Sequence, residues 1–220
     1  MKIGIFGTGV VGSTIGSALT RAGHEVRMGS RTRGNDKAVA WVGAAGANAS
    51  EGTFADAAAF GEIVFNCTRG DAALAVAAQA GAENLAGKVL VDVSNPLDFS
   101  KGFPPTLTVL NDDSLGEQLQ RALPGTHVVK ALNTLTAALM VEPSRLSGPH
   151  DLLICGNDAG AKATVTSLLR ESFGWKIVRD LGDITNARGT EAWLLLWTRL
   201  YGHLGTPDFN LHLETSGGAA

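Results

Sequence analysis

The feature that most limits the possible folds is a glycine motif near the start of the chain. An apolar run, KIGIF at residues 2–6, leads through this motif into a helical pattern. The motif has the form Gly-x-Gly-x-x-Gly and consists of Gly7, Thr8, Gly9, Val10, Val11 and Gly12. Between a strand and a helix, the first glycine permits a tight turn, the second lets the backbone approach a pyrophosphate, and the third lets the helix pack closely. The motif therefore predicts a dinucleotide-binding loop, with the first amides of the helix facing the phosphates.

Short β-rich runs alternate with helical patterns along the chain, which indicates βαβ units. Strands are expected at 2–6, 25–29, near 47, and at 62–66, 88–93, 127–132, 151–156 and 176–180. Helices are expected at 11–22, 36–44, 53–60, 71–80, 114–122, 159–172 and 185–202. A chain of 220 residues is long enough to bury one sizeable core. We predict an α/β fold with a Rossmann-type, doubly wound, mostly parallel sheet. It forms a single domain over residues 1–220, with a small C-terminal helical extension at about 185–215.

The turn after the second expected strand indicates which dinucleotide is bound. Sites that prefer NAD place an acidic residue about 20 positions after the motif, where it bonds the ribose 2′-hydroxyl. Here the sequence offers hydroxyl and guanidinium groups instead, from Ser30, Arg31, Thr32 and Arg33. Such groups suit a dianionic 2′-phosphate, so we expect NADP(H) as the cofactor. The alternative interpretation is a polar turn with two solvated arginines.

Three later loops follow strands at the sheet edge where ligands of doubly wound folds bind. The first offers Thr68 and Arg69 to the cofactor. The alternative interpretation of this loop is a helix N-terminus capped by Asp71. The second and third loops are expected to contribute cofactor contacts from Ser94 and Asn95, and substrate contacts from Pro96, Leu97, Asn133 and Leu135. Thr134 adds a further polar group, whereas Lys130 is interpreted as structural rather than as a general base.

Composition excludes several classes of partner. The formal net charge of -3 gives no basic field for nucleic acid. Cys67 and Cys155 are far apart, and the five histidines are scattered, so the sequence predicts neither a disulfide framework nor a metal site. The apolar runs are short or interrupted by glycine, which argues against a signal peptide or membrane span. We expect a soluble, cytoplasmic protein.

The C-terminal segment is apolar around most of its expected helix. Its large side chains are Trp193, Leu194, Leu195, Leu196, Trp197, Leu200 and Tyr201. Such a helix needs burial on several sides. Two explanations remain open, burial in the domain core and contact in a homodimer, and we favour the homodimer. The segment LGTPDFN after it is a candidate wall of the substrate pocket.

Several segments together resemble a known family. The stretches FGTGVVG, GSRT, SNPL, VVKALNTL and DITNARGTEAWLLLWTRLYGHLG look like those of the F420-dependent NADP oxidoreductases. The likeness covers residues 1 to about 210, and its first half is shared with STEAP-type metalloreductases. The resemblance implies a usually dimeric protein in which Thr8, Ser30, Arg31 and Thr32 hold NADP. It also implies that Asn95, Pro96, Asn133 and Leu135 lie near the reacting rings. Some relatives have histidine at the position of Asn133.

The leading functional hypothesis is an NADP-dependent oxidoreductase that transfers a hydride between NADP(H) and coenzyme F420 or a similar flat redox carrier. Direct transfer between stacked rings needs little acid or base from the protein, and we assign no catalytic residue. Tyr201 is the only phenol and has no Y-x-x-x-K partner, which disfavours a short-chain-type carbonyl reductase. The alternatives are an NADPH-binding sensor without turnover and an NADPH-dependent flavin or ferric reductase.

Overall fold

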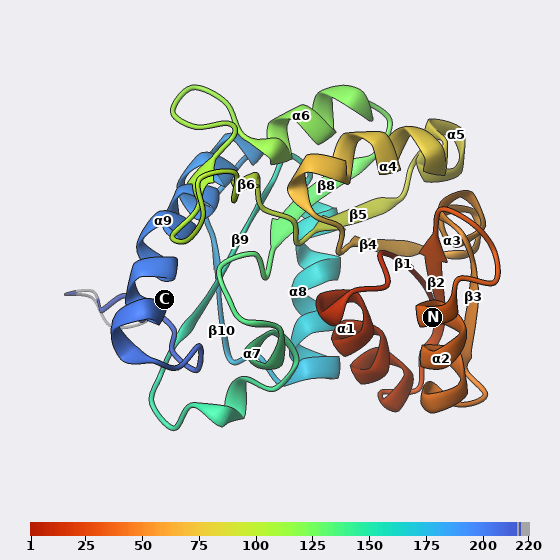
Figure 1. The fold of residues 1–220 in the computed structure, drawn as a ribbon, viewed down its shortest axis with the longest axis horizontal. Coiled ribbons are helices and arrows are strands. Elements are labelled where there is room, and N and C mark those ends of the chain that lie inside the picture. Colours follow the sequence, from red (N-terminus) through yellow and green to blue (C-terminus); the bar gives the residue numbers. More distant parts are fainter. Residues whose placement is uncertain (215, 217–220) are drawn as a thin grey trace.

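An eight-stranded sheet runs through the computed structural model, which describes residues 1–214 and 216 (Figure 1). Residue 215 of the expected C-terminal extension and residues 217–220 of the expected domain lie outside the described residues. The strands of this sheet are β1 Lys2–Phe6, β2 Glu25–Ser30, β3 Ala49–Thr53, β4 Ile63–Asn66, β5 Val89–Asp92, β8 His127–Ala131, β9 Asp151–Gly156 and β10 Ile177–Asp180. Two further strands, β6 Leu97–Asp98 and β7 Thr106–Leu107, form a separate antiparallel pair.

The sheet has the doubly wound order predicted from the sequence. Its strands are arranged as β10-β9-β8-β5-β4-β1-β2-β3, and the order reverses between β1 and β4. Strand β1 pairs in parallel with both β2 and β4. Ligands of such sheets bind beyond the carboxyl ends of the strands at this switch point. The glycine motif follows β1 and therefore lies there.

One pairing departs from the parallel pattern, since β8 and β9 are antiparallel. Residues 132–150 join them through only a five-residue helix and a single 3₁₀ turn. A parallel pairing needs a connection that travels back along the sheet, and this link stays at the edge where β8 ends. Strand β10 then pairs in parallel with β9 through a long helix. The expectation of a mostly parallel sheet is confirmed.

Helices cover both faces of the sheet. The α-helices are α1 Val10–Arg21, α2 Asp36–Ala45, α3 Phe54–Phe60, α4 Ala73–Ala80, α5 Ala82–Leu85, α6 Leu115–Ala122, α7 Ala137–Val141, α8 Ala159–Phe173 and α9 Ala187–Leu204. In Figure 1, α4 and α6 lie above the sheet, whereas α1, α2 and α7 lie below it. Helix α9 follows a 3₁₀ turn, Ile184–Asn186, and closes the end of the sheet near β9 and β10. The sequence did not predict α5 and α7, which are four and five residues long.

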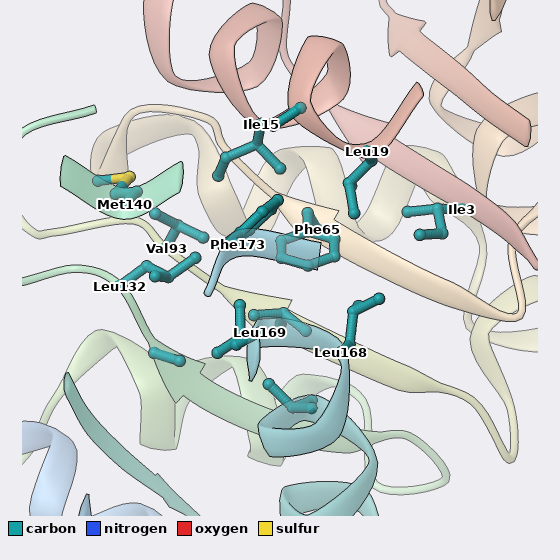
Figure 2. Packing of buried hydrophobic residues seen from close by; sticks show 14 of the residues in the cluster. Ile3, Ile15, Leu19, Phe65, Val93, Leu132, Met140, Leu168, Leu169 and Phe173 are labelled. Atoms are coloured by element: carbon teal, nitrogen blue, oxygen red, sulfur yellow. The ribbon is translucent and has the colours of Figure 1, made fainter. Parts of the chain in front are cut away.

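Two buried clusters hold these layers together. The larger one lies between the sheet and helices α1, α2, α7 and α8. Figure 2 shows Leu19 of α1, Phe65 of β4 and Leu168 of α8 converging within it. The second cluster packs α3, α4, α5 and α6 against the other face. Burial on both faces explains why β4 reads as a continuous buried run, IVFN, rather than an alternating one.

Candidate active site

The loop between β1 and α1 has the geometry that the glycine spacing predicts. Gly7 has φ = 108°, and a Cβ on it would lie 2.9 Å from the Cys67 carbonyl oxygen. A Cβ on Gly12 would collide with the Gly7 carbonyl oxygen. A Cβ on Gly9, by contrast, would enter open space. Gly9 caps α1, so the open space lies beside the first helical amides, which lack partners within the helix. This is the place where the glycine motif predicts a phosphate.

The two arginines of the turn after β2 have different surroundings. The Ser30 hydroxyl is buried and donates to the Thr32 carbonyl oxygen at 2.6 Å. Arg33 Nη2 lies 2.5 Å from Asp56 Oδ1, so this guanidinium is already engaged. Hydrogen bonds from Thr53, together with Arg33, hold the pKa of Asp56 below its usual range. Arg31 is exposed and has no ion pair within the described part of the chain. Arg31 is therefore the more available cation.

A cleft of about 260 Å³ lies beyond the ends of β4, β5 and β8. Its lining includes eight of the predicted cofactor and substrate residues: Val11, Thr68, Arg69, Ser94, Asn95, Leu97, Asn133 and Leu135. The other lining residues are Cys67, Gly70, Val93, Phe99, Met140, Leu194 and Trp197. Pro96, the turn from Ser30 to Arg33 and the other residues of the glycine motif (Gly7, Thr8, Gly9, Val10 and Gly12) are not part of this lining. The structure thus brings the start of α1, three strand ends and α9 to one cleft.

Two asparagines form a reciprocal pair in the cleft. Asn95 Nδ2 donates to the Asn133 carbonyl oxygen at 2.8 Å, and Asn133 Nδ2 donates to Asn95 Oδ1 at 3.0 Å. Asn133 Nδ2 also donates to the Thr190 carbonyl oxygen of α9 at 3.1 Å. The remaining Asn133 atom, Oδ1, is buried without a partner. An unsatisfied buried acceptor is costly, so Oδ1 suits a ligand that brings an N–H.

A buried ion cluster lies beneath these asparagines. Lys130 Nζ lies 2.7 Å from both Asp92 Oδ2 and Glu191 Oε1, and it donates to the Ser94 carbonyl oxygen at 2.6 Å. All three side chains are almost fully buried. Burial lowers the pKa of Lys130, but the two carboxylates outweigh this effect and raise it above the ordinary value. Lys130 is thus a charged structural group, which agrees with the interpretation from the sequence that it is not a general base.

Among the described residues, the cleft holds neither an activated thiol nor a group of metal ligands. Burial, followed by the charge of Asp92, raises the pKa of the Cys67 thiol far above its usual value. A thiol that stays protonated is a poor nucleophile. Across residues 1–214 and 216, no group of three or more histidine, cysteine, aspartate or glutamate side chains is placed to hold a metal ion.

Helix α9 contributes two cleft residues that the sequence analysis had assigned to the domain core or to a homodimer contact. Leu194 and Trp197 line the cleft, and the indole of Trp197 stacks with the rings of Tyr201 and Phe209. Trp197 Nε1 is buried without a partner. The all-apolar character of this segment indicated burial, but not that one side would form a cleft wall. Two other leucines of this helix, Leu196 and Leu204, are each 50% exposed.

Comparison with known proteins places these features in a family. A family model described as NADP oxidoreductase, coenzyme F420-dependent, matches residues 2–96. The chain is 49% identical to a crystal structure of a candidate F420-dependent NADP reductase from Arthrobacter sp. FB24. That match covers 98% of this chain and 100% of the other, with a TM-score of 0.92. Reductive aminase from Aspergillus terreus, with 20% identity and a TM-score of 0.66, shows a likeness of fold alone.

Two curated relatives match over part of their length. Metalloreductase STEAP3 from Rattus norvegicus is 32% identical over 193 residues, which is 87% of this chain and 36% of the relative. F420-dependent NADP reductase from Methanocaldococcus jannaschii is 34% identical over 113 residues, which is 50% of this chain and 49% of the relative. The matched regions thus span between a third and a half of these relatives. Among the described residues, no helix is long and apolar enough to cross a membrane.

Proposed function

The chain belongs to the family of F420-dependent NADP oxidoreductases, and on that premise we propose that it transfers a hydride between NADP(H) and coenzyme F420 or a similar flat redox cofactor. The observation that carries this proposal is the single cleft that joins Val11 at the start of α1 to Trp197 on α9. A dinucleotide held at the glycine loop would extend along this cleft toward α9. A second flat ring would then lie between the nicotinamide and the α9 wall.

The cofactor end of the proposal rests on the glycine loop and the turn after β2. The open space at Gly9 admits a pyrophosphate, and the first amides of α1 point toward it with the positive end of the helix dipole. Arg31 and the hydroxyl of Thr32 would hold the 2′-phosphate, with Ser30 fixing the turn. Thr68, Arg69 and Ser94, which line the cleft, would lie along the dinucleotide between its phosphates and its nicotinamide.

The reacting end would be held by orphaned polar atoms and apolar walls. Asn133 Oδ1 would accept a hydrogen bond from the nicotinamide carboxamide. Because Asn133 Nδ2 donates to Asn95 Oδ1, the Asn95 side chain would help to hold Asn133 in the orientation that this bond requires. Trp197 Nε1 would donate to a carbonyl oxygen on the edge of the second ring. Leu97, Leu135 and Leu194 line the cleft and would provide apolar surface for the ring faces. Pro96 would fix the turn after Asn95.

Bound NADPH supplies the hydride from C4 of its nicotinamide, while a solvent proton completes the reduction of the acceptor. The chain's own contribution would be orientation and exclusion of water, which require no titratable group. The high pKa of the Cys67 thiol and the engaged ammonium of Lys130 agree with this division of labour. No residue of the chain is therefore assigned as an acid or base catalyst.

We also propose that the protein is a cytoplasmic homodimer. Phe103 and Tyr201 contact each other at 6.3 Å between ring centroids, and they stand 57% and 39% exposed. Leu196 and Leu204 lie half exposed on the same helix, α9. A second copy of the chain would cover this apolar surface. Two free cysteines suit a reducing compartment.

The test is oxidation of NADPH by the purified protein, followed at 340 nm, with F420, FMN and a ferric chelate offered separately. The proposal expects turnover with F420 and a weaker response, or none, with the ferric chelate. Rapid reduction of the chelate or of FMN without F420 turnover would make the protein a flavin or ferric reductase. Tight NADPH binding without turnover on any of the three would instead support a sensor.

A further inference from the structure

The buried cluster of Asp92, Lys130 and Glu191 carries a fixed charge arrangement. Both oxygens of Asp92 accept hydrogen bonds, from Asn66, from the amide and hydroxyl of Ser94, and from Lys130. Both oxygens of Glu191 also accept, from the amides of Leu115 and Gly116 and from Lys130. Every carboxyl oxygen of the cluster therefore has a donor, which holds the three side chains in one arrangement.

Each bond of Lys130 leads to an element that forms the cleft. Its bond to the Ser94 carbonyl oxygen fixes the backbone directly before Asn95. Its bond to Glu191 fixes α9 at the residue next to Thr190, whose carbonyl accepts from Asn133. The ammonium thus ties the ends of β5 and β8 and the start of α9 to one point.

A strained residue lies between Lys130 and Asn133. Leu132 is fully buried and has φ = 65°, the left-handed region that branched and bulky residues avoid. Such strain persists only where the surroundings impose it, and it is concentrated at functional sites. The bend at Leu132 follows β8 directly, so the chain turns before Asn133. The Asn133 side chain then donates to Asn95 Oδ1 and to the Thr190 carbonyl oxygen, while Asn133 Oδ1 keeps no partner.

We propose that Lys130, with Asp92 and Glu191, is a positioning residue that fixes the Asn95–Asn133 pair and so selects which face of the nicotinamide gives up its hydride. This inference rests on the proposed NADP(H) function. Stability alone is a weak explanation for the cluster, because buried ion pairs rarely stabilise more than apolar replacements of similar volume. The cluster is explained instead if it holds the cleft residues in the one arrangement that hydride transfer requires.

The chain offers a matched control in Lys162. This lysine is 9% exposed, lies 2.8 Å from Asp180 Oδ1 and donates to the Gly182 carbonyl oxygen at 2.9 Å. Like Lys130, it pairs with an aspartate and a backbone carbonyl oxygen, although Asp180 is half exposed. It belongs to α8, and neither of its partners is an element of the cleft. Lys162→Met should destabilise the protein without changing the nicotinamide site.

The experiment compares Lys130→Met, Glu191→Gln and Lys162→Met with the unmodified protein. Glu191→Gln keeps the side-chain shape and leaves a one-to-one pair of Lys130 and Asp92, so it protects the test if Lys130→Met does not fold. Three quantities are measured: the Kd of NADPH, the fluorescence of bound NADPH, and the transfer of deuterium from NADPH labelled separately at the 4R and 4S positions.

We expect Lys130→Met and Glu191→Gln to keep the Kd of NADPH within threefold, because the glycine loop and Arg31 lie on other strands. Their rate of hydride transfer should fall at least tenfold, the emission enhancement of bound NADPH should be lost, and deuterium should transfer from both faces. Lys162→Met should retain single-face transfer. Single-face transfer at an undiminished rate in folded Glu191→Gln would overturn the inference, as would equal effects in Lys162→Met.

The readouts separate this inference from the proposed function. If the unmodified protein binds NADPH but turns over none of the acceptors, the proposed reaction is wrong. The fluorescence of bound NADPH then decides whether Lys130 fixes the nicotinamide. An enhancement that survives in Glu191→Gln and Lys130→Met would refute the positioning role without any need for an acceptor.

Discussion

Replacing Arg31 by alanine should abolish most of the preference for NADPH over NADH. In the structure Arg31 is exposed and not held by an ion pair among the described residues, whereas Arg33 is bound to Asp56 at 2.5 Å. A hydrogen bond to a charged group contributes about 1.5–3 kcal/mol, which corresponds to roughly ten- to hundredfold in affinity. The Kd of NADPH should therefore rise by that factor in Arg31→Ala. The Kd of NADH, which lacks the phosphate, should stay unchanged.

Arg33→Ala is the matched control for this prediction. Its guanidinium would have to leave Asp56 before it could reach a phosphate, so its removal should weaken NADPH less than Arg31→Ala does. The loss of the exposed Arg33–Asp56 pair should itself cost only about 0–1 kcal/mol of stability. Calorimetric titration of the unmodified protein and both variants with NADPH and with NADH measures the six dissociation constants at each of two salt concentrations. Equal weakening of NADH and NADPH by Arg31→Ala, or a larger loss in Arg33→Ala, would refute this assignment of the two arginines.

Three further predictions follow from the cleft and the C-terminal region. Leu135→Ala should lower the hydride-transfer rate about tenfold by loosening ring alignment, whereas Leu139→Ala, buried outside the cleft lining, should cost stability only; stopped-flow kinetics and thermal unfolding distinguish them. Light scattering should give twice the 22.7 kDa chain mass, and a monomer at micromolar concentration would contradict the homodimer. Burial raises the pKa of Asp151, but Arg179, the Leu213 amide and His212 outweigh it and hold the pKa below 3.8. Stability from this carboxylate is therefore present above pH 3.8 and lost as the pH falls through the lower folded-state value. Protonation of Asp151 should release residues 209–213, which bind this carboxylate through His212 and the Leu213 amide. Because Phe209 stacks on Trp197, the release should change Trp197 fluorescence. An acid titration without this change, or the same titration curve in Asp151→Asn, would contradict the prediction.

The parts of the fold that could be predicted from sequence are those with a local physical signal. The glycine spacing predicted the turn at Gly7 and the start of α1, because positive φ and close approach exclude a side chain there. Continuous apolar runs predicted central strands such as β4. Helix α7 has only five residues, too few for a periodic pattern. The reversal of β9 depends on that short connection and carries no local signal of its own.

The candidate site divides in the same way. Residues directly after strands, such as Thr68, Asn95 and Asn133, were predicted to lie together, and the structure brings them into one cleft. The partnership of Lys130 with Glu191 joins residues far apart in the chain, and no motif marks it. A leucine at φ = 65° is equally hidden, since leucine disfavours that conformation. Trp197 was visible as part of an apolar helix but not as a cleft residue.

The central claim is that hydride passes directly between two rings aligned in the cleft. NADPH carrying deuterium at one C4 position is mixed with F420 in ordinary water, and the reduced F420 is analysed by mass spectrometry and NMR. The account predicts that the label appears at C5 of the deazaflavin from one C4 face only, and that chelators leave the rate unchanged. Complete loss of the label to water, or no reaction with F420 beside rapid reduction of FMN or a ferric chelate, would contradict it.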